Sequence, residues 1–157
     1  MYGFNYHKPH SIDEAIQLFL GAEDGMYLAG GHTLLPSMKQ RLAAPTDVID
    51  LAGIEGLSGV ELVGAGLEIG ALTTHDEVAT SPVVQAVIPA LAELASLIGD
   101  AQVRNRGTIG GSVANSDPAA DYPAGVLGLA AEIVTNKRSV SADDFFTAMF
   151  ETALEEG

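Results

Sequence analysis

The chain of 157 residues contains no cysteine and few positively charged side chains. Without cysteine it cannot form a disulfide, a thiolate zinc site, a cysteine-ligated iron–sulfur cluster or a cysteine nucleophile of its own. Seven Lys and Arg stand against 21 Asp and Glu, which gives a formal net charge of −14. Phosphates of nucleic acids and anionic membranes would meet a field of their own sign, so neither is expected as a partner.

Long apolar runs and a leader sequence are also lacking. The longest run without a charged residue, Val78–Ala92, is about five residues too short for a membrane span, and Pro82 and Pro89 interrupt it. The first residues, Met1–Phe4, lack the basic and then apolar pattern of a signal peptide. We therefore expect a cytoplasmic protein, either free or at the inner face of the membrane. Apolar residues make up 47% of the chain, which is enough for a core.

The hydrophobic periodicity predicts a mixed α+β chain in two lobes, residues 1–56 and 57–157. Capping boxes begin at Ser11 and Thr74, since each is followed three residues later by Glu. Residues 101–121 fit neither the helical nor the strand period. The expected helices are 12–20, 34–42, 82–99 with a restart at Pro89, 122–130 and 145–149; the expected strands are 26–29, 48–51, 60–63, 67–72, 132–135 and 138–140.

Glycine is the over-used residue, with 18 in the chain, above the average of roughly 7%. Two pairs, Gly30-Gly31 and Gly110-Gly111, have Thr or Ser close by, so backbone amides could approach a ligand without an intervening Cβ. Two such loops suit a diphosphate, although tight turns are the alternative explanation. No P-loop is present, and Gly64–Gly70 has the wrong spacing for a Rossmann fingerprint.

Four of the seven cations, Lys39, Arg41, Arg104 and Arg106, lie within ten positions of a glycine pair. They could attract an anion or simply form salt bridges with the surplus carboxylates.

Other polar residues give weaker signals. Asp121 could accept hydrogen bonds from ribose or ribityl hydroxyls, or the segment from Asp117 could cap the following helix. His32 and His75 have no partner set at metal-ligand spacing, so polar contacts in loops are expected for both. No Gly-x-Ser-x-Gly nucleophile elbow occurs. We predict no catalytic side chain and no metal site.

Two segments, Ala29-Gly-Gly-His-Thr-Leu-Leu-Pro-Ser-Met-Lys39 and Gln102-Val-Arg-Asn-Arg-Gly-Thr-Ile-Gly-Gly-Ser112 with Asp117-Pro-Ala-Ala-Asp121, resemble the FAD-binding medium subunit of the molybdenum hydroxylases. Within that family the likeness is greatest to aerobic carbon monoxide dehydrogenase. It extends from Phe4–Pro9 through Gly70–His75 to Phe150–Leu154.

The resemblance implies a two-lobed α+β FAD-binding fold of the vanillyl-alcohol-oxidase (PCMH) type, with FAD between the lobes. Family members are nearly twice as long and have a third, C-terminal domain, which is missing here. By position the resemblance assigns two pyrophosphate loops, two residues near the isoalloxazine ring and a carboxylate on the polyol or adenosine part. These cofactor-binding residues are Leu28, Ala29, Gly30, Gly31, His32, Thr33 and Leu34, then Ile98 and Gly99, then Thr108, Ile109, Gly110, Gly111 and Ser112, and finally Asp121.

The resemblance also implies partners: a small subunit with two [2Fe-2S] clusters and a large molybdopterin subunit, assembled as a dimer of heterotrimers. FAD would pass electrons from the clusters to a quinone, NAD or oxygen. Two alternatives stay open. One is a truncated, non-catalytic nucleotide-binding or assembly module, and the other is a stand-alone flavin oxidase, for whose substrate-capping domain 157 residues leave no room.

Overall fold

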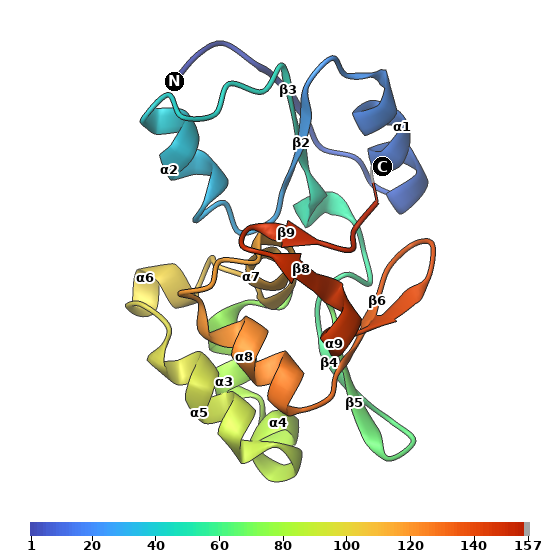
Figure 1. Ribbon diagram of the computed structural model, residues 1–157, viewed down its shortest axis with the longest axis vertical. Helices are drawn as coiled ribbons and strands as arrows, with labels where there is room; N and C mark the ends of the chain where they lie inside the picture. The colour runs from blue at the N-terminus through green and yellow to red at the C-terminus, as the bar shows by residue number, and fades with distance from the viewer. Residues whose placement is uncertain (156–157) are drawn as a thin grey trace.

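The computed structural model describes residues 1–155, which form two lobes stacked one above the other (Figure 1). The first lobe ends in a short 3-10 helix, η1 (Leu51–Gly53), and the second begins at strand β4 (Val60–Val63). The sequence places its lobe boundary between residues 56 and 57, inside this connection, and that exact boundary stays a prediction.

The first lobe is built on a parallel sheet of strands β1 (Asn5–His7), β2 (Gly25–Leu28) and β3 (Asp47–Asp50), in the order β1-β3-β2. Helix α1 (Ile12–Gly21) connects β1 to β2, and the short helix α2 (Leu34–Lys39) lies between β2 and β3. The sequence predicted β2, β3 and both helices, but it missed β1. That strand has only three residues, and two of them are exposed, so it carries no periodic signal.

Helix α1 begins as its capping box predicts. The Ser11 hydroxyl accepts the amide of Glu14, and the Glu14 carboxylate accepts the amide of His10. The buried face of α1 packs on β3 through Ala15 and Ile49, with Ile54 beside them. Phe19 stacks on Tyr27 with ring centroids 4.7 Å apart.

The second lobe opens with the predicted hairpin, β4 and β5 (Gly66–Ile69), paired antiparallel. Three helices follow: α3 (His75–Thr80), α4 (Pro82–Val87) and α5 (Pro89–Leu97). A complete capping box starts α3, because the Thr74 hydroxyl accepts the Glu77 amide and the Glu77 carboxylate accepts the Thr74 amide.

The glycine-rich stretch after α5 is more helical than its sequence indicates. It contains α6 (Ala101–Arg104) and α7 (Ile109–Asn115), and α8 (Asp121–Gly128) follows. The expectation of irregular structure over 101–121 was therefore wrong. Each of these helices is short, and α6 and α7 both begin at a side-chain cap, Asp100 and Thr108.

The last segment begins with the predicted hairpin of β6 (Glu132–Val134) and β7 (Ser139–Ser141). Helix α9 (Ala142–Phe145) then gives way to β8 (Phe146–Ala148), which pairs with β9 (Glu151–Thr152). The prediction of a helix over 145–149 was wrong, because β8 is stabilised by pairing with a later strand rather than by local periodicity.

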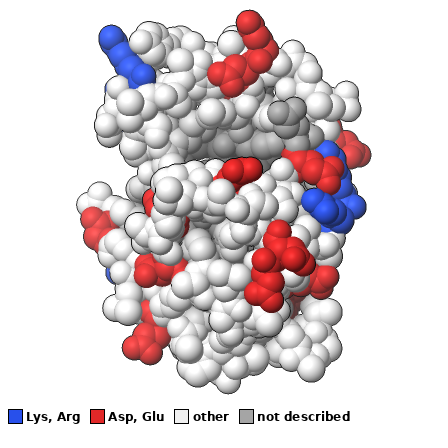
Figure 2. Space-filling model, viewed as in Figure 1, with Lys and Arg blue, Asp and Glu red and all other residues white. Residues whose placement is uncertain are grey.

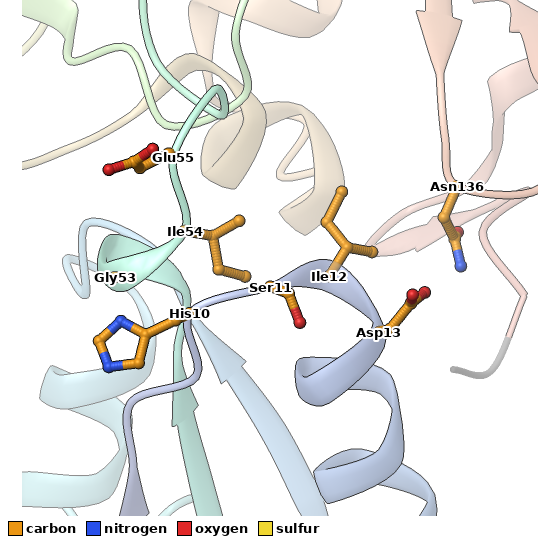
Figure 3. A pocket seen from close by; sticks show the side chains of 8 residues that line it. All are labelled: His10, Ser11, Ile12, Asp13, Gly53, Ile54, Glu55 and Asn136. Carbon is orange, nitrogen blue, oxygen red and sulfur yellow. The ribbon is translucent and has the colours of Figure 1, made fainter.

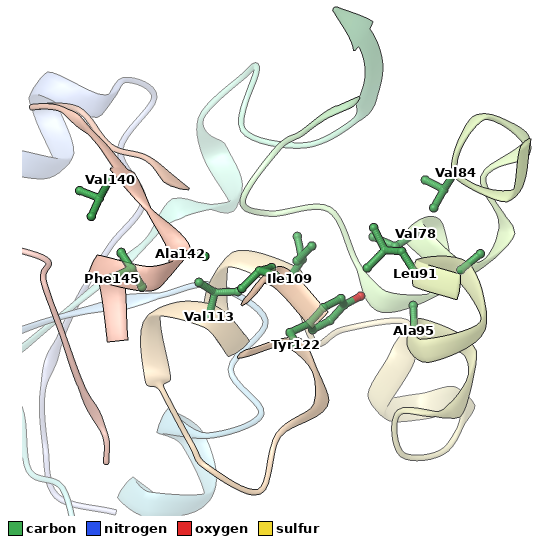
Figure 4. Close-up of a cluster of buried hydrophobic side chains, with 12 residues drawn as sticks. Val78, Val84, Leu91, Ala95, Ile109, Val113, Tyr122, Val140, Ala142 and Phe145 are labelled. Atoms are coloured by element: carbon green, nitrogen blue, oxygen red, sulfur yellow. The ribbon is translucent and has the colours of Figure 1, made fainter. Parts of the chain in front are cut away.

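The main core lies in the second lobe, where α3, α4, α5, α7, α8, β7 and α9 meet (Figure 4). Tyr122 and Phe145 are its largest side chains, and both are fully buried. None of the described helices is long and apolar enough to cross a membrane.

Candidate functional site

The two glycine loops, whose glycine pairs are 80 residues apart in sequence, touch each other where the lobes meet. A Cβ on Gly30 would overlap the carbonyl oxygen of Arg106 and would lie 2.8 Å from Cα of Gly107. Such a close approach of two backbones is possible only without a side chain. Gly111 in turn faces Ala29, since its Cβ would lie 3.4 Å from that of Ala29. The structure thus brings the two predicted loops together.

The first loop presents free backbone donors. Within residues 1–155, the consecutive amides of Gly30, Gly31, His32, Thr33 and Leu34 have no hydrogen-bond acceptor. Gly31 has a φ of 78°, a left-handed conformation that favours glycine. Thr33 caps α2 without a side-chain hydrogen bond. A run of unsatisfied amides of this kind binds anionic oxygens, so the first loop fits a phosphate group.

The second loop is built differently. The amide of Ile109 donates to the Thr73 carbonyl and that of Gly110 to the Ala71 carbonyl, while the amide of Gly111 donates to the Thr108 hydroxyl. A Cβ on Gly110 would lie 2.5 Å from that of Ala71. These amides donate within the second lobe, and the assignment of the second glycine pair to the pyrophosphate stays a prediction. Its glycines allow α7 to pack closely.

The residues assigned to the flavin ring and the polyol come from the second lobe. Asp121 is the first residue of α8, is exposed, and accepts no hydrogen bond from any described residue. Ile98 is partly buried against the main core, and Gly99 has a φ of 53°. All fifteen assigned residues stay predictions as FAD contacts.

Of the four cations near the glycine pairs, only some have a role visible in the structure. Arg104 donates to the carbonyls of Ile98 and Gly99 at 3.2 and 2.9 Å, which holds the turn after α5. Arg41 lies over the Tyr2 ring at 5.4 Å. Salt bridges do not involve any of the four among the described residues.

We call the contact of Gly30 with Arg106 and Gly107 the crossing of the two loops. His75, for which the sequence predicts only polar contacts in a loop, lies directly behind this crossing. His75, at the start of α3, is 5% exposed, and its amide donates to the Gly107 carbonyl at 2.9 Å. Its ring lies 5.3 Å from that of Tyr122. Burial, and secondarily the charge of nearby His32, lower the pKa of His75. The only local signal was its position after the capping Thr74.

Tyr122 carries the other buried polar atom without a partner. Its side chain is completely buried, and no described residue bonds its hydroxyl. In Figure 4 the hydroxyl points toward Val78 and Leu91, away from Val113. Burial raises the pKa of Tyr122 well above its usual range, so this hydroxyl stays protonated.

One hollow on the surface lies away from the predicted site. It has a volume of about 610 Å³ and lies between the start of α1, the end of η1 and the tip of the β6–β7 hairpin (Figure 3). Asp13 and Glu55 line it and would repel a phosphate. Acidic side chains are also scattered over both lobes on the face shown in Figure 2. No cluster of three His, Cys, Asp or Glu suitable for a metal occurs in residues 1–155.

Comparison with known proteins identifies the family of the chain. Residues 2–157 match the family described as the FAD binding domain in molybdopterin dehydrogenase. The carbon monoxide dehydrogenase medium chain of Hydrogenophaga pseudoflava is 46% identical over 98% of this chain and 55% of its own length. The nicotine 6-hydroxylase medium subunit of Paenarthrobacter nicotinovorans is 39% identical over 95% of this chain and 54% of its own.

Solved structures show the same fold. Carbon monoxide dehydrogenase from Hydrogenophaga pseudoflava superposes with a TM-score of 0.95, and quinoline 2-oxidoreductase from Pseudomonas putida 86 with 0.93, at 46% and 35% identity. Each match covers 99% of this chain and 56% of the other. The chain therefore spans about half the length of these relatives. The likeness to the molybdenum hydroxylase medium subunits and their two-lobed α+β fold is thus confirmed, and the chain belongs to the family of FAD-binding domains of molybdopterin dehydrogenases.

Proposed function

We propose that this chain is the FAD-binding part of an electron-transfer subunit in a molybdenum hydroxylase of the carbon monoxide dehydrogenase type. In such an enzyme, [2Fe-2S] clusters on a small partner subunit deliver electrons to FAD, after a molybdopterin subunit has oxidised the substrate. FAD then reduces an external acceptor. The assembly we expect is a dimer of heterotrimers.

One observation carries the cofactor assignment: the run of free amides at Gly30–Leu34, held against the second loop where the two lobes meet. A diphosphate bridge would fill these donors with anionic oxygens, and amides bind such oxygens without adding a charge. Asp121, which has no acceptor role among the described residues, is available for a hydroxyl of the ribityl or ribose part.

The chain's own residues hold and orient the cofactor rather than attack a substrate. FAD when bound supplies the one- and two-electron chemistry. The chain has no cysteine that could ligate an iron–sulfur cluster. In the proposed enzyme the small partner subunit holds the clusters and the large one holds the molybdopterin.

Mass spectrometry of the cofactor released from the purified chain tests the binding function. We expect FAD, because a diphosphate uses more of the free amides than a monophosphate. FMN as the sole species, or no flavin after reconstitution, would reject the proposal. Binding of ADP without any flavin would favour a nucleotide-binding module instead.

Electron flow is tested by adding the molybdenum and iron–sulfur subunits together with the hydroxylase substrate. Flavin absorbance near its visible maximum should bleach only when the partners are present. Bleaching by substrate with this chain alone would favour a stand-alone flavin oxidase.

A further inference from the structure

His75 is a polar side chain in a place that gives it no partner. Its Nδ1 atom is sealed from solvent and has no hydrogen bond among the described residues. Its Nε2 atom makes no hydrogen bond to residues 1–155 either, and it lies at the glycine crossing, where a Cβ on Gly107 would be only 2.5 Å away. On its other side, Gly107 packs against Gly30 of the first loop. The ring therefore reaches from the core of the second lobe to the back of the first loop.

The surroundings decide which ring nitrogen carries the proton. A neutral imidazole has one N–H donor and one acceptor nitrogen. A proton on Nδ1 would bury an N–H group among Tyr122 and the apolar core with nothing to accept it, which is the costlier arrangement. Burial also keeps the ring neutral. His75 therefore presents an Nε2–H donor at the crossing.

We propose that His75 is a binding residue for the FAD diphosphate, donating a hydrogen bond from Nε2 to a phosphate oxygen held at Gly30–Leu34. This inference rests on the proposed FAD site. The Nε2 atom faces Gly107, and a Cβ on Gly30 would lie 2.8 Å from Cα of that same residue, so the ring lies near the first loop. The hydrogen bond would give the otherwise unpartnered ring the acceptor that the protein does not supply.

The unbonded His75 ring predicts opposite effects of its replacement on stability and on ligand affinity. A buried polar ring with no protein partner destabilises the chain in the absence of ligand, so an apolar residue of similar size should be tolerated or should stabilise. Residues kept for binding at the expense of stability behave in this way. A residue kept only for packing would show the opposite: its replacement would lower stability and leave affinity for ligand unchanged.

The test measures thermal unfolding without ligand and binding of FAD, ADP and riboflavin by calorimetry, for the unmodified chain and three variants. His75→Leu should melt at the same or a higher temperature, yet bind FAD and ADP on the order of ten- to a hundredfold more weakly, the usual effect of a lost hydrogen bond to a charged group. Riboflavin, which has no phosphate, should bind equally to the unmodified chain and to His75→Leu. His75→Gln, whose amide nitrogen can reach the Nε2 position, should recover much of the lost affinity. His10→Leu, an exposed histidine at the other hollow, is the matched control and should change neither FAD nor ADP binding.

Nitrogen-15 spectra of the unmodified chain provide a measurement that needs no variant. Above pH 7 the His75 ring should be protonated at Nε2, and its signal should shift when ADP is added. Unchanged FAD affinity in His75→Leu, an equal loss for riboflavin, or a ring protonated at Nδ1 would each overturn the assignment of His75 while leaving the FAD site itself in place. No binding of FAD or ADP by the unmodified chain would overturn the proposed function, and this inference with it.

Discussion

Replacing Gly30 with Ala tests whether the crossing of the two loops holds the site together. The new Cβ would overlap the Arg106 carbonyl oxygen and would lie 2.8 Å from both the Arg106 carbonyl carbon and Cα of Gly107. Ordinary carbon contacts are about 3.5–4.0 Å, so the two backbones must separate by roughly 1 Å. Every atom in the way belongs to backbone, and no side-chain rotation can relieve the clash.

Overpacking of this kind costs typically about 1–3 kcal/mol, and we expect the upper end because both neighbours are backbone. For a chain of this size, 3 kcal/mol corresponds to a fall in Tm of roughly 6–12 °C. The same separation moves the free amides of the first loop away from Gly107 and the His75 ring behind it. FAD affinity, measured by fluorescence quenching well below the melting temperature, should therefore fall as well.

Gly21→Ala is the matched control, because a Cβ there meets nothing within 4 Å and the residue lies in α1. It should leave FAD binding unchanged and stabilise the chain by at most about 1 kcal/mol, as Gly to Ala does at a helical position. If Gly30→Ala melted and bound FAD like the unmodified chain, the loops would not need their close contact, and the account of the crossing would fail.

Three further predictions concern stability. Phe145→Ala, at a fully buried position, should lower the free energy of unfolding in urea by about 3–5 kcal/mol, whereas Phe150→Ala, at an exposed one, should change it by less than about 0.5 kcal/mol; comparable losses would contradict the position of the core. Thr74→Ala removes the capping box of α3 and should cost about 1 kcal/mol in the same assay, while Thr74→Ser should restore most of it. Stability without ligand should fall as the pH drops below about 6.5, because the pKa of His75 is lower in the folded chain and the unfolded chain therefore binds the proton first. His75→Gln should flatten this part of the pH profile of stability. A profile that is unchanged in this variant would reject His75 as the cause.

Local signals in the sequence predicted much of the fold. The capping residues Ser11 and Thr74 start α1 and α3, as expected, and the hairpins at 60–69 and 132–141 form where turn residues separate short β-type runs. These features depend on residues within a few positions of each other. They need no knowledge of the rest of the chain.

The errors occur where distant contacts decide the structure. Helix α7 contains Gly110 and Gly111, which are poor helix formers. It is stabilised by the Thr108 cap and by hydrogen bonds from its backbone amides to the carbonyls of Ala71 and Thr73. Strand β8 exists because it pairs with β9. Neither interaction has a periodic signature in the sequence. The helices within 101–121 were therefore missed, and the helix expected over 145–149 was wrong.

The same distinction explains what the sequence could say about the site. The abundance of glycine drew attention to both pairs, and the family resemblance assigned both to the pyrophosphate. In the structure the backbone amides of the two pairs differ. Gly30 and Gly31 leave amides free where the lobes meet. The amide of Gly110 instead donates to Ala71 in the segment before α3, and that of Gly111 donates to the Thr108 hydroxyl that caps α7. In a chain with a net charge of −14, neutral amide dipoles and a neutral histidine can hold an anion without adding cations that the surplus carboxylates would capture. The scarcity of positive charge is therefore compatible with binding a diphosphate, provided that the donors are fixed in place, and the contact between Gly30 and Arg106 is what fixes them.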